Sequence, residues 1–389
     1  MKSPLTDLVE PYPIAVSDDD LKDLLSRLAA TRWPDRETVP DAAQGPQLDR
    51  IRALCDHWAT GYDWRRTERA INGFGSFGTV LDGIDVHFLH VRSAEPGAVP
   101  LLLCHGWPGS ILEFRHLIGP LTDPVAHGGH AEDAFHLVIP SMPGFGFSGR
   151  PATTGWDISR VADAWITLMR RLGYDSWFAQ GGDWGAAVVE QLTRKAPGSV
   201  RGAHFNFPLV FPTAQEMSEA TGEEQRMMAR AQRYQSELDG YAREQATRPQ
   251  TIGYSLADSP AGLAAWIYTL FQDVTDNDGD PEEVVDRDDI LDDIMLYWLP
   301  NAGASAARLY WEERQGRAGG SGSGPNPVPA GFSIFPGEAV QASRRWIERR
   351  YETVLHYAQL DRGGHFAALE QPGVLTDEIR TTFRAVRAG

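Results

Sequence analysis

The stretch QGGDWG, residues 180–185, decides the fold of this chain of 389 residues. It lies between a short apolar segment, residues 177–180, and a helical segment that starts at Ala186. Small residues around a central polar residue suit a sharp strand-to-helix turn, because a bulkier neighbour would clash with the strained backbone there. The pattern predicts a turn that presents Asp183 as a nucleophile. The simpler interpretation is that Asp183 only caps the helix.

Apolar and helical segments alternate along the chain on both sides of this turn. We predict strands at 100–104, 135–139, 177–180, 332–335 and 353–360, and helices at 111–118, 161–172, 186–195 and 374–387. Short apolar strands that alternate with helices of about ten residues indicate crossover connections and a mostly parallel sheet. The predicted fold class is therefore α/β.

Two regions depart from this alternation. In the first region, at the N-terminus, we predict helices at 17–30 and 48–59. A hairpin follows, with strands at 74–79 and 84–91 and a turn at Asp82-Gly83. The second, residues 213–312, is helical, charged and rich in tyrosine. We expect an N-terminal extension (1–97), the first part of the α/β core (98–212), a helical insertion (213–312) and the second part of the core (313–389).

Composition argues against several classes of protein. The 36 Lys and Arg residues against 53 Asp and Glu give a net charge of −17, which would repel nucleic acids and anionic lipids. Two cysteines, Cys55 and Cys104, are too few for a disulfide framework or a zinc cluster. No apolar stretch approaches the roughly 20 residues that cross a bilayer, and the first 20 residues do not read as a signal peptide. We expect a soluble, cytoplasmic protein that binds neither nucleic acid nor membrane.

Two glycine-rich loops complete a catalytic pattern around Asp183. The loop HGWPGS, residues 105–110, follows the strand at 100–104, where this architecture places an oxyanion hole. Its backbone donors would be the N–H groups of Trp107 and Trp184. The alternative for Trp107 is a core aromatic residue in a tight turn.

The loop RGGHF, residues 362–366, follows the last predicted strand and carries His365. The acid that orients this histidine should follow the preceding strand, where Glu338 lies in the sequence FPGE. Asp361 is the rival acid, but it shares a loop with His365. The chain order nucleophile, acid, histidine is the one this type of active site uses.

Taken together, these motifs resemble the epoxide hydrolases of the α/β-hydrolase fold, and within them the microsomal-type branch. The likeness extends along the whole chain, through the sequences HGWPGS (105–110), SMPGFGFS (141–148), GGDWG (181–185), DSPAGLAAW (258–266), FPGE (335–338) and GGHFAALEQP (363–372). It implies a helical lid at 213–312 and an N-terminal extension that braces lid and core. It also implies two lid tyrosines that hold the epoxide oxygen, and the residues that match by position are Tyr241 and Tyr310.

The resemblance implies a soluble bacterial enzyme that converts an epoxide and water to a vicinal diol. Asp183 would attack a ring carbon and form an ester, and His365, oriented by Glu338, would activate the water that hydrolyses it. No metal or cofactor is needed. The aromatic residues of the lid suggest a bulky apolar or aryl epoxide, in natural-product biosynthesis such as that of enediynes or in xenobiotic detoxification. The expected partners are a small-molecule epoxide and water, and a homodimer is left open.

Two other functions share parts of this pattern. A haloalkane dehalogenase also uses an aspartate nucleophile but needs halide-binding donors and no tyrosine pair. A non-catalytic binding protein of the same fold would be expected to lack one of Asp183, Glu338 and His365. The acidic run at 273–293 does not match a calcium loop and predicts a solvated loop and helix start.

Overall fold

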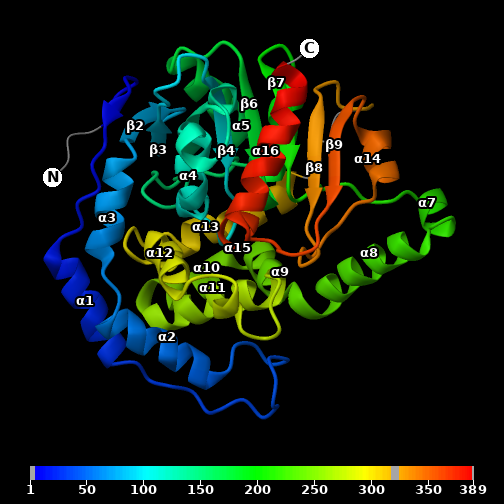
Figure 1. Ribbon diagram of the computed structural model, residues 1–389. Coiled ribbons are helices and arrows are strands. Elements are labelled where there is room, and N and C mark those ends of the chain that lie inside the picture. The colour runs from blue at the N-terminus through cyan, green and yellow to red at the C-terminus, as the bar shows by residue number, and fades with distance from the viewer. Residues whose placement is uncertain (1–4, 317–323, 388–389) are drawn as a thin grey trace.

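A nine-stranded sheet forms the centre of the computed structural model, which describes residues 5–316 and 324–387 (Figure 1). The strand order is β1-β2-β3-β5-β4-β6-β7-β8-β9, and the strands from β5 to β9 are parallel. The strands are β1 (Glu10–Pro11), β2 (Ser76–Leu81), β3 (Ile84–Val91), β4 (Val99–Cys104), β5 (Phe135–Pro140), β6 (Trp177–Gly181), β7 (Val200–Phe205), β8 (Ala330–Ile334) and β9 (Val354–Gln359). The predicted α/β class with a mostly parallel sheet is confirmed.

Helices cover both faces of the sheet. Helices α4 (Arg115–Thr122) and α16 (Pro372–Arg387) pack together on one face, and α5 (Ile158–Arg171) and α6 (Asp183–Lys195) pack together on the other (Figure 1). Residues Leu101, Leu102 and Leu103 of β4 are all fully buried. Burial on both faces explains why this strand reads as a continuous apolar run.

The N-terminal extension contains three helices rather than the two predicted. They are α1 (Asp18–Ala29), α2 (Leu48–Thr60) and α3 (Trp64–Gly73). The hydroxyl of Ser17 caps α1 by accepting the N–H of Asp20 at 3.1 Å, as the sequence indicates. Helix α3 was missed because it buries only Trp64, Thr67 and Ile71 among charged residues.

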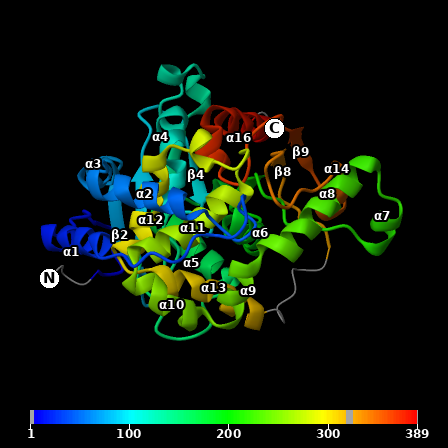
Figure 2. The ribbon, with the colours of Figure 1, turned by 90° about the horizontal axis from the view of Figure 1, so that it is seen from below.

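A group of helices follows β7 in the chain and precedes β8; most of it lies below the carboxyl ends of the parallel strands, and its first helix lies at the right edge of the view in Figure 1 (Figures 1 and 2). These are α7 (Ala214–Ser218), α8 (Gly222–Arg233), α9 (Gly240–Thr247), α10 (Pro249–Asp258), α11 (Pro260–Val274), α12 (Arg287–Trp298) and α13 (Gly303–Gly316), with a π-helical turn at Tyr234–Leu238. Short helices α14 (Arg344–Arg350) and α15 (Ala367–Glu370) follow β8 and β9. Helices α1 and α2 contact α11, so the N-terminal extension packs against this group.

Two predictions from the sequence need correction. Strand β7 was not predicted, because its sequence VRGAHF mixes Arg, Gly and His with apolar residues. The acidic run is also not fully solvated, since Asp292 and Asp293 are buried in α12. Asp292 pairs there with Arg66 of α3 and Arg115 of α4, which ties the N-terminal extension to the core.

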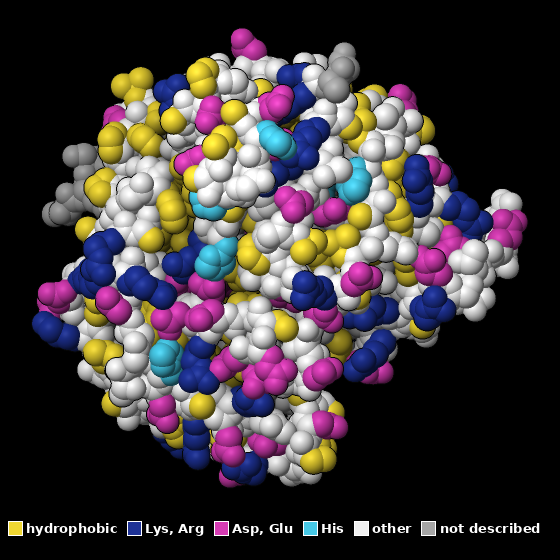
Figure 3. Space-filling model, viewed as in Figure 1, with side chains coloured by type: hydrophobic (Ala, Val, Ile, Leu, Met, Phe, Trp, Pro, Cys, Tyr) yellow, Lys and Arg dark blue, Asp and Glu magenta, His cyan; other side chains and the backbone are white. Residues whose placement is uncertain are grey.

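On the face shown in Figure 3, acidic and basic side chains are interspersed.

Candidate active site

Asp183 lies on a strained turn at the carboxyl end of β6. Its φ angle is 49°, in the left-handed region that non-glycine residues rarely adopt. A Cβ atom at position 185 would lie 1.9 Å from the carbonyl oxygen of Cys104, so only glycine allows α6 to start this close to β4. The turn therefore holds Asp183 at the carboxyl end of β6. The N-cap of α6 is Gly182 and not Asp183, so the simpler interpretation of Asp183 as a helix cap is wrong.

The loop after β4 binds the Asp183 carboxylate directly. The backbone N–H of Trp107 donates to Oδ1 of Asp183 at 2.7 Å. The second predicted donor, the backbone N–H of Trp184, makes no hydrogen bond to this carboxylate within the described residues. Trp184 packs its ring edge-on against Tyr310 at a centroid distance of 4.9 Å.

His105 holds this loop in place, a role that the sequence analysis did not assign. Its Nδ1 lies 2.9 Å from the Gly106 carbonyl oxygen, and its Nε2 lies 3.2 Å from the backbone nitrogen of Met142. Burial lowers the pKa of His105 to about 4. A neutral ring that donates at Nδ1 and accepts at Nε2 fits both contacts, so His105 joins the loops after β4 and β5.

His365 lies between two carboxylates. Its Nδ1 is 2.9 Å from Oε2 of Glu338, and its Nε2 is 3.5 Å from Oδ2 of Asp183. Only 1% of the Glu338 side chain is exposed, against 11% for His365. The rival acid Asp361 is exposed, and among the described residues its side chain makes no hydrogen bond or ion pair with His365.

The two carboxylates control the charge of His365. Burial alone would lower the pKa of the imidazole, but Glu338, together with Asp183, outweighs burial and holds this pKa well above 6.5. The two carboxylates therefore favour the protonated form of the imidazole.

Tyr241 of α9 and Tyr310 of α13 come together above Asp183. Their ring centroids are 5.9 Å apart, and Tyr241 stacks on Trp107 at 4.8 Å. Burial is the main cause that holds both phenol pKa values well above 10. The next cause is the neighbouring phenol for Tyr241 and the charge of Asp183 for Tyr310. Both hydroxyls therefore keep their protons at neutral pH and can act as donors.

The other tyrosines of residues 213–312 take different positions. Tyr254 is 71% exposed on α10, and Tyr297 donates its hydroxyl to the Gly109 carbonyl oxygen at 2.8 Å. Tyr234 lies close to the candidate site, because its hydroxyl is 2.5 Å from that of Tyr241. No pattern in the sequence distinguished Tyr234 from its neighbours.

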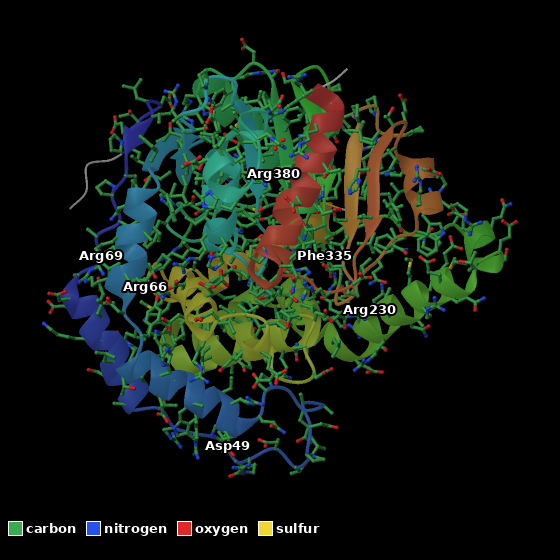
Figure 4. The ribbon with its side chains drawn as sticks, in the orientation of Figure 1. Asp49, Arg66, Arg69, Arg230, Phe335 and Arg380 are labelled. Atoms are coloured by element: carbon green, nitrogen blue, oxygen red, sulfur yellow. The ribbon has the colours of Figure 1, made fainter. Side chains whose placement is uncertain are left out.

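Arg230 of α8 supports the loop that carries Glu338. Its guanidinium donates to the Gly337 carbonyl oxygen at 2.6 Å. Figure 4 shows Arg230 on α8, below Phe335 at the end of β8. This contact fixes the end of α8 relative to the Glu338 loop.

Comparison with known proteins gives a consistent result. Residues 9–114 match the family described as epoxide hydrolase N terminus, and residues 99–257 match the alpha/beta hydrolase fold. The chain is 52% identical to a Stigmatella aurantiaca protein named "Putative epoxide hydrolase", over 98% of this chain and 86% of that protein. The chain belongs to the epoxide hydrolase family. It is also 32% identical to epoxide hydrolase 1 of Sus scrofa, over 96% of this chain and 88% of that protein.

A solved structure agrees with this family assignment. The juvenile hormone epoxide hydrolase of the silkworm Bombyx mori superimposes with a TM-score of 0.91 at 27% identity, covering 99% of this chain and 96% of the silkworm protein. The assignment of this chain to the epoxide hydrolases, rather than to haloalkane dehalogenases or binding proteins, is confirmed. Among the described residues, no helix is long and apolar enough to span a membrane.

Proposed function

We propose that this epoxide hydrolase opens its substrate through a covalent ester on Asp183. One observation supports this most strongly: the Asp183 carboxylate lies between the Trp107 N–H on one oxygen and His365 on the other. A carboxylate held in this way can attack a saturated carbon in line with the breaking C–O bond. The strained turn that holds Asp183 directly after β6 also supports this role.

Ring opening needs a proton donor, because the departing oxygen becomes an alkoxide. The hydroxyls of Tyr241 and Tyr310 are neutral, buried donors beside Asp183. Two hydrogen bonds in a site with little water stabilise the charge that develops on the oxygen. We infer that one phenol transfers its proton to this oxygen.

Ester formation changes the charge that surrounds His365. The resting site holds His365 as a cation between two carboxylates, and alkylation removes the charge of Asp183. The pKa of His365 then falls, since one of the two groups that raise it is neutral. Its released proton balances the one given to the alkoxide, and neutral His365 becomes able to accept a proton from water.

Hydrolysis restores the resting charges. Water gives a proton to His365 and attacks the carbonyl carbon of the ester, while the Trp107 and Trp184 N–H groups bind the oxyanion. The bond to the diol oxygen then breaks, and that oxygen takes up a proton. Since an ester plus water gives a carboxylate, an alcohol and one proton, the surplus proton returns to His365.

We propose a bulky apolar or aryl epoxide as the substrate. A cavity of about 820 Å³ reaches Tyr241 between the N-terminal loop 41–45 and the lid. Tyr241 and Trp266 line one part of this cavity, and the charged residues Asp41, Arg233, Glu237 and Asp273 line other parts. Four further expectations stay predictions. They are a role in natural-product biosynthesis, such as that of enediynes, or in detoxification; the cytoplasmic location; a homodimer; and the division of the chain at residues 97, 212 and 312, which makes 213–312 the lid.

Intact-protein mass spectrometry tests the mechanism. The parent and the His365→Gln variant are mixed with styrene oxide and quenched at intervals. An increase by one substrate mass, located at Asp183 by peptide mapping, supports the ester. In labelled water, ester hydrolysis places solvent oxygen in the Asp183 carboxylate. If the parent enzyme forms diol over several cycles and Asp183 carries no label, the ester mechanism is overturned.

A further inference from the structure

A third phenol, Tyr234, contacts the candidate proton donor Tyr241. Their hydroxyl oxygens are 2.5 Å apart, and Tyr241 is the one hydrogen-bond partner of the Tyr234 hydroxyl among the described residues. Tyr241 is 8% exposed, and Tyr234 is partly buried. A hydrogen bond this short in a buried setting is stronger than the same bond in water.

An unusual backbone geometry lies between these two residues. Tyr234 and Tyr241 are seven positions apart, and in a regular α-helix that spacing would separate them by two turns, or about 10 Å along the axis. The chain instead forms a π-helical turn, in which the N–H of Asp239 donates to the Tyr234 carbonyl oxygen at 3.0 Å. Such turns are rare and are often found at functional sites.

Charged side chains hold this wide turn. Arg243 pairs with Asp239 at 2.8 Å and also donates to the Gln235 carbonyl oxygen. One turn before Tyr234, Arg230 anchors α8 to the Glu338 loop. The position of Tyr234 is thus fixed from both sides of the turn.

The direction of the hydrogen bond follows from proton counting. A phenol has a single proton, so Tyr241 cannot give it to Tyr234 and to an epoxide oxygen at once. When Tyr241 donates to the substrate, Tyr234 must be the donor to Tyr241. Donation from Tyr234 also stabilises negative charge on the Tyr241 oxygen.

We propose that Tyr234 is a positioning residue for ring opening: it donates to the Tyr241 hydroxyl, directs the Tyr241 proton at the epoxide oxygen and stabilises the phenolate left behind. In this step the Tyr241 O–H bond and the epoxide C–O bond break, while the Asp183–carbon bond and the new product O–H bond form. Tyr234 keeps its own proton. The proton that His365 releases after ester formation returns to Tyr241. This inference rests on the proposed ester mechanism.

The test measures alkylation alone, as growth of the Asp183 adduct in the His365→Gln background with styrene oxide. Tyr234→Phe removes one hydroxyl and keeps the ring. We expect about a tenfold slower alkylation, since a hydrogen bond to a charged group is lost. Tyr254→Phe removes an exposed phenol from α10 of the same lid and should leave the rate unchanged.

Double variants separate positioning from packing. Because Tyr234 acts through Tyr241, Tyr234→Phe should slow alkylation about tenfold when combined with Tyr310→Phe and less than twofold when combined with Tyr241→Phe. Equal slowing in both combinations would show that Tyr234 only packs against the site, and a parent-like rate in Tyr234→Phe itself would overturn the proposal. If no adduct forms even with Tyr234 present, the proposed ester mechanism fails first and this inference fails with it.

Discussion

The Nε2 atom of His365 lies 3.5 Å from Oδ2 of Asp183. This distance exceeds that of a charge-assisted hydrogen bond but leaves the two charges in strong mutual contact. The gap has a consequence for mechanism. The proposed nucleophile Asp183 is therefore not tied up by His365, while its charge, after that of Glu338, helps to raise the pKa of the ring.

Replacing Asp183 by Asn should abolish turnover and preserve the fold. The change removes the attacking charge with almost no change in volume, and the amide oxygen can still accept the Trp107 N–H. Diol formation is measured by chromatography in freshly purified protein, before deamidation regenerates aspartate. Activity near the parent value in such a sample would remove Asp183 from the role of nucleophile.

Replacing His365 by Gln should leave ring opening possible and stop the reaction at the ester. Alkylation needs no base, whereas the attack of water does. Mass spectrometry should show one substrate mass added per chain, stable for at least the time of many parent turnovers. A variant that neither turns over nor accumulates adduct would place His365 in ring opening as well.

Tyr241→Phe and Tyr310→Phe should each slow alkylation by about 100- to 1000-fold, the usual range for losing one donor to a developing oxyanion. The double variant should be slower than either single variant, because both donors are lost. Single-turnover kinetics isolates this step. Tyr297 is not a substitute donor, since its hydroxyl is committed to Gly109, and Tyr254 is exposed, so Tyr254→Phe serves as the control. If both single variants alkylate at the parent rate, the epoxide oxygen is held by other groups.

Much of the site could be predicted from the sequence because loops at the carboxyl ends of parallel strands converge on one edge. Asp183, Glu338 and His365 each follow a strand of the parallel part of the sheet, so their order along the chain indicates their meeting point. Tyr234 could not be found in this way. Its contact with Tyr241 spans a π-helical turn, and the spacing of seven residues gives no sign of that turn.

Buried charge was equally hard to recognise. Asp292 and Asp293 occur in a run rich in aspartate, which normally indicates solvent exposure, yet both are buried. Asp292 is compensated by arginines that are distant in sequence, Arg66 and Arg115. Only the three-dimensional packing of α3 and α4 against α12 shows these partners.

Replacing Glu338 by Gln should lower the pKa of His365 and slow ester hydrolysis more than alkylation. Glu338 is the largest of the influences that raise this pKa, and it also orients the ring. A histidine whose pKa is raised by folding adds stability below its unfolded value of about 6.5, and this stability is lost as the pH rises through the folded value. The variant should therefore lose stability mainly at acidic pH.

Two measurements check the Glu338 prediction. A pH titration of the His365 ring by NMR should show the lower pKa, and single-turnover kinetics should show hydrolysis slowed by about 100-fold or more, since loss of the orienting acid in a related triad costs even more. The exposed rival acid gives a matched control, because Asp361→Asn should leave both unchanged. An unchanged His365 titration in Glu338→Gln would show that Glu338 does not set the charge of this ring.

Replacing Asp293 by Asn should stabilise the protein at alkaline pH. Burial raises the pKa of this carboxyl to about 8; repulsion from Asp292 adds to the increase, and the side chain of Ser110 opposes it. Because the unfolded carboxyl ionises near pH 4 and the folded one does not, Asp293 costs stability progressively as the pH rises from about 4 to 8. The variant should unfold in urea with a free energy at least about 1 kcal/mol higher than the parent at pH 8, and close to the parent below pH 4. Asp278→Asn, in the exposed part of the same acidic run, should change stability by less than about 0.5 kcal/mol at either pH. A parent-like pH dependence in Asp293→Asn would mean that this carboxyl is charged in the folded protein and has found a partner.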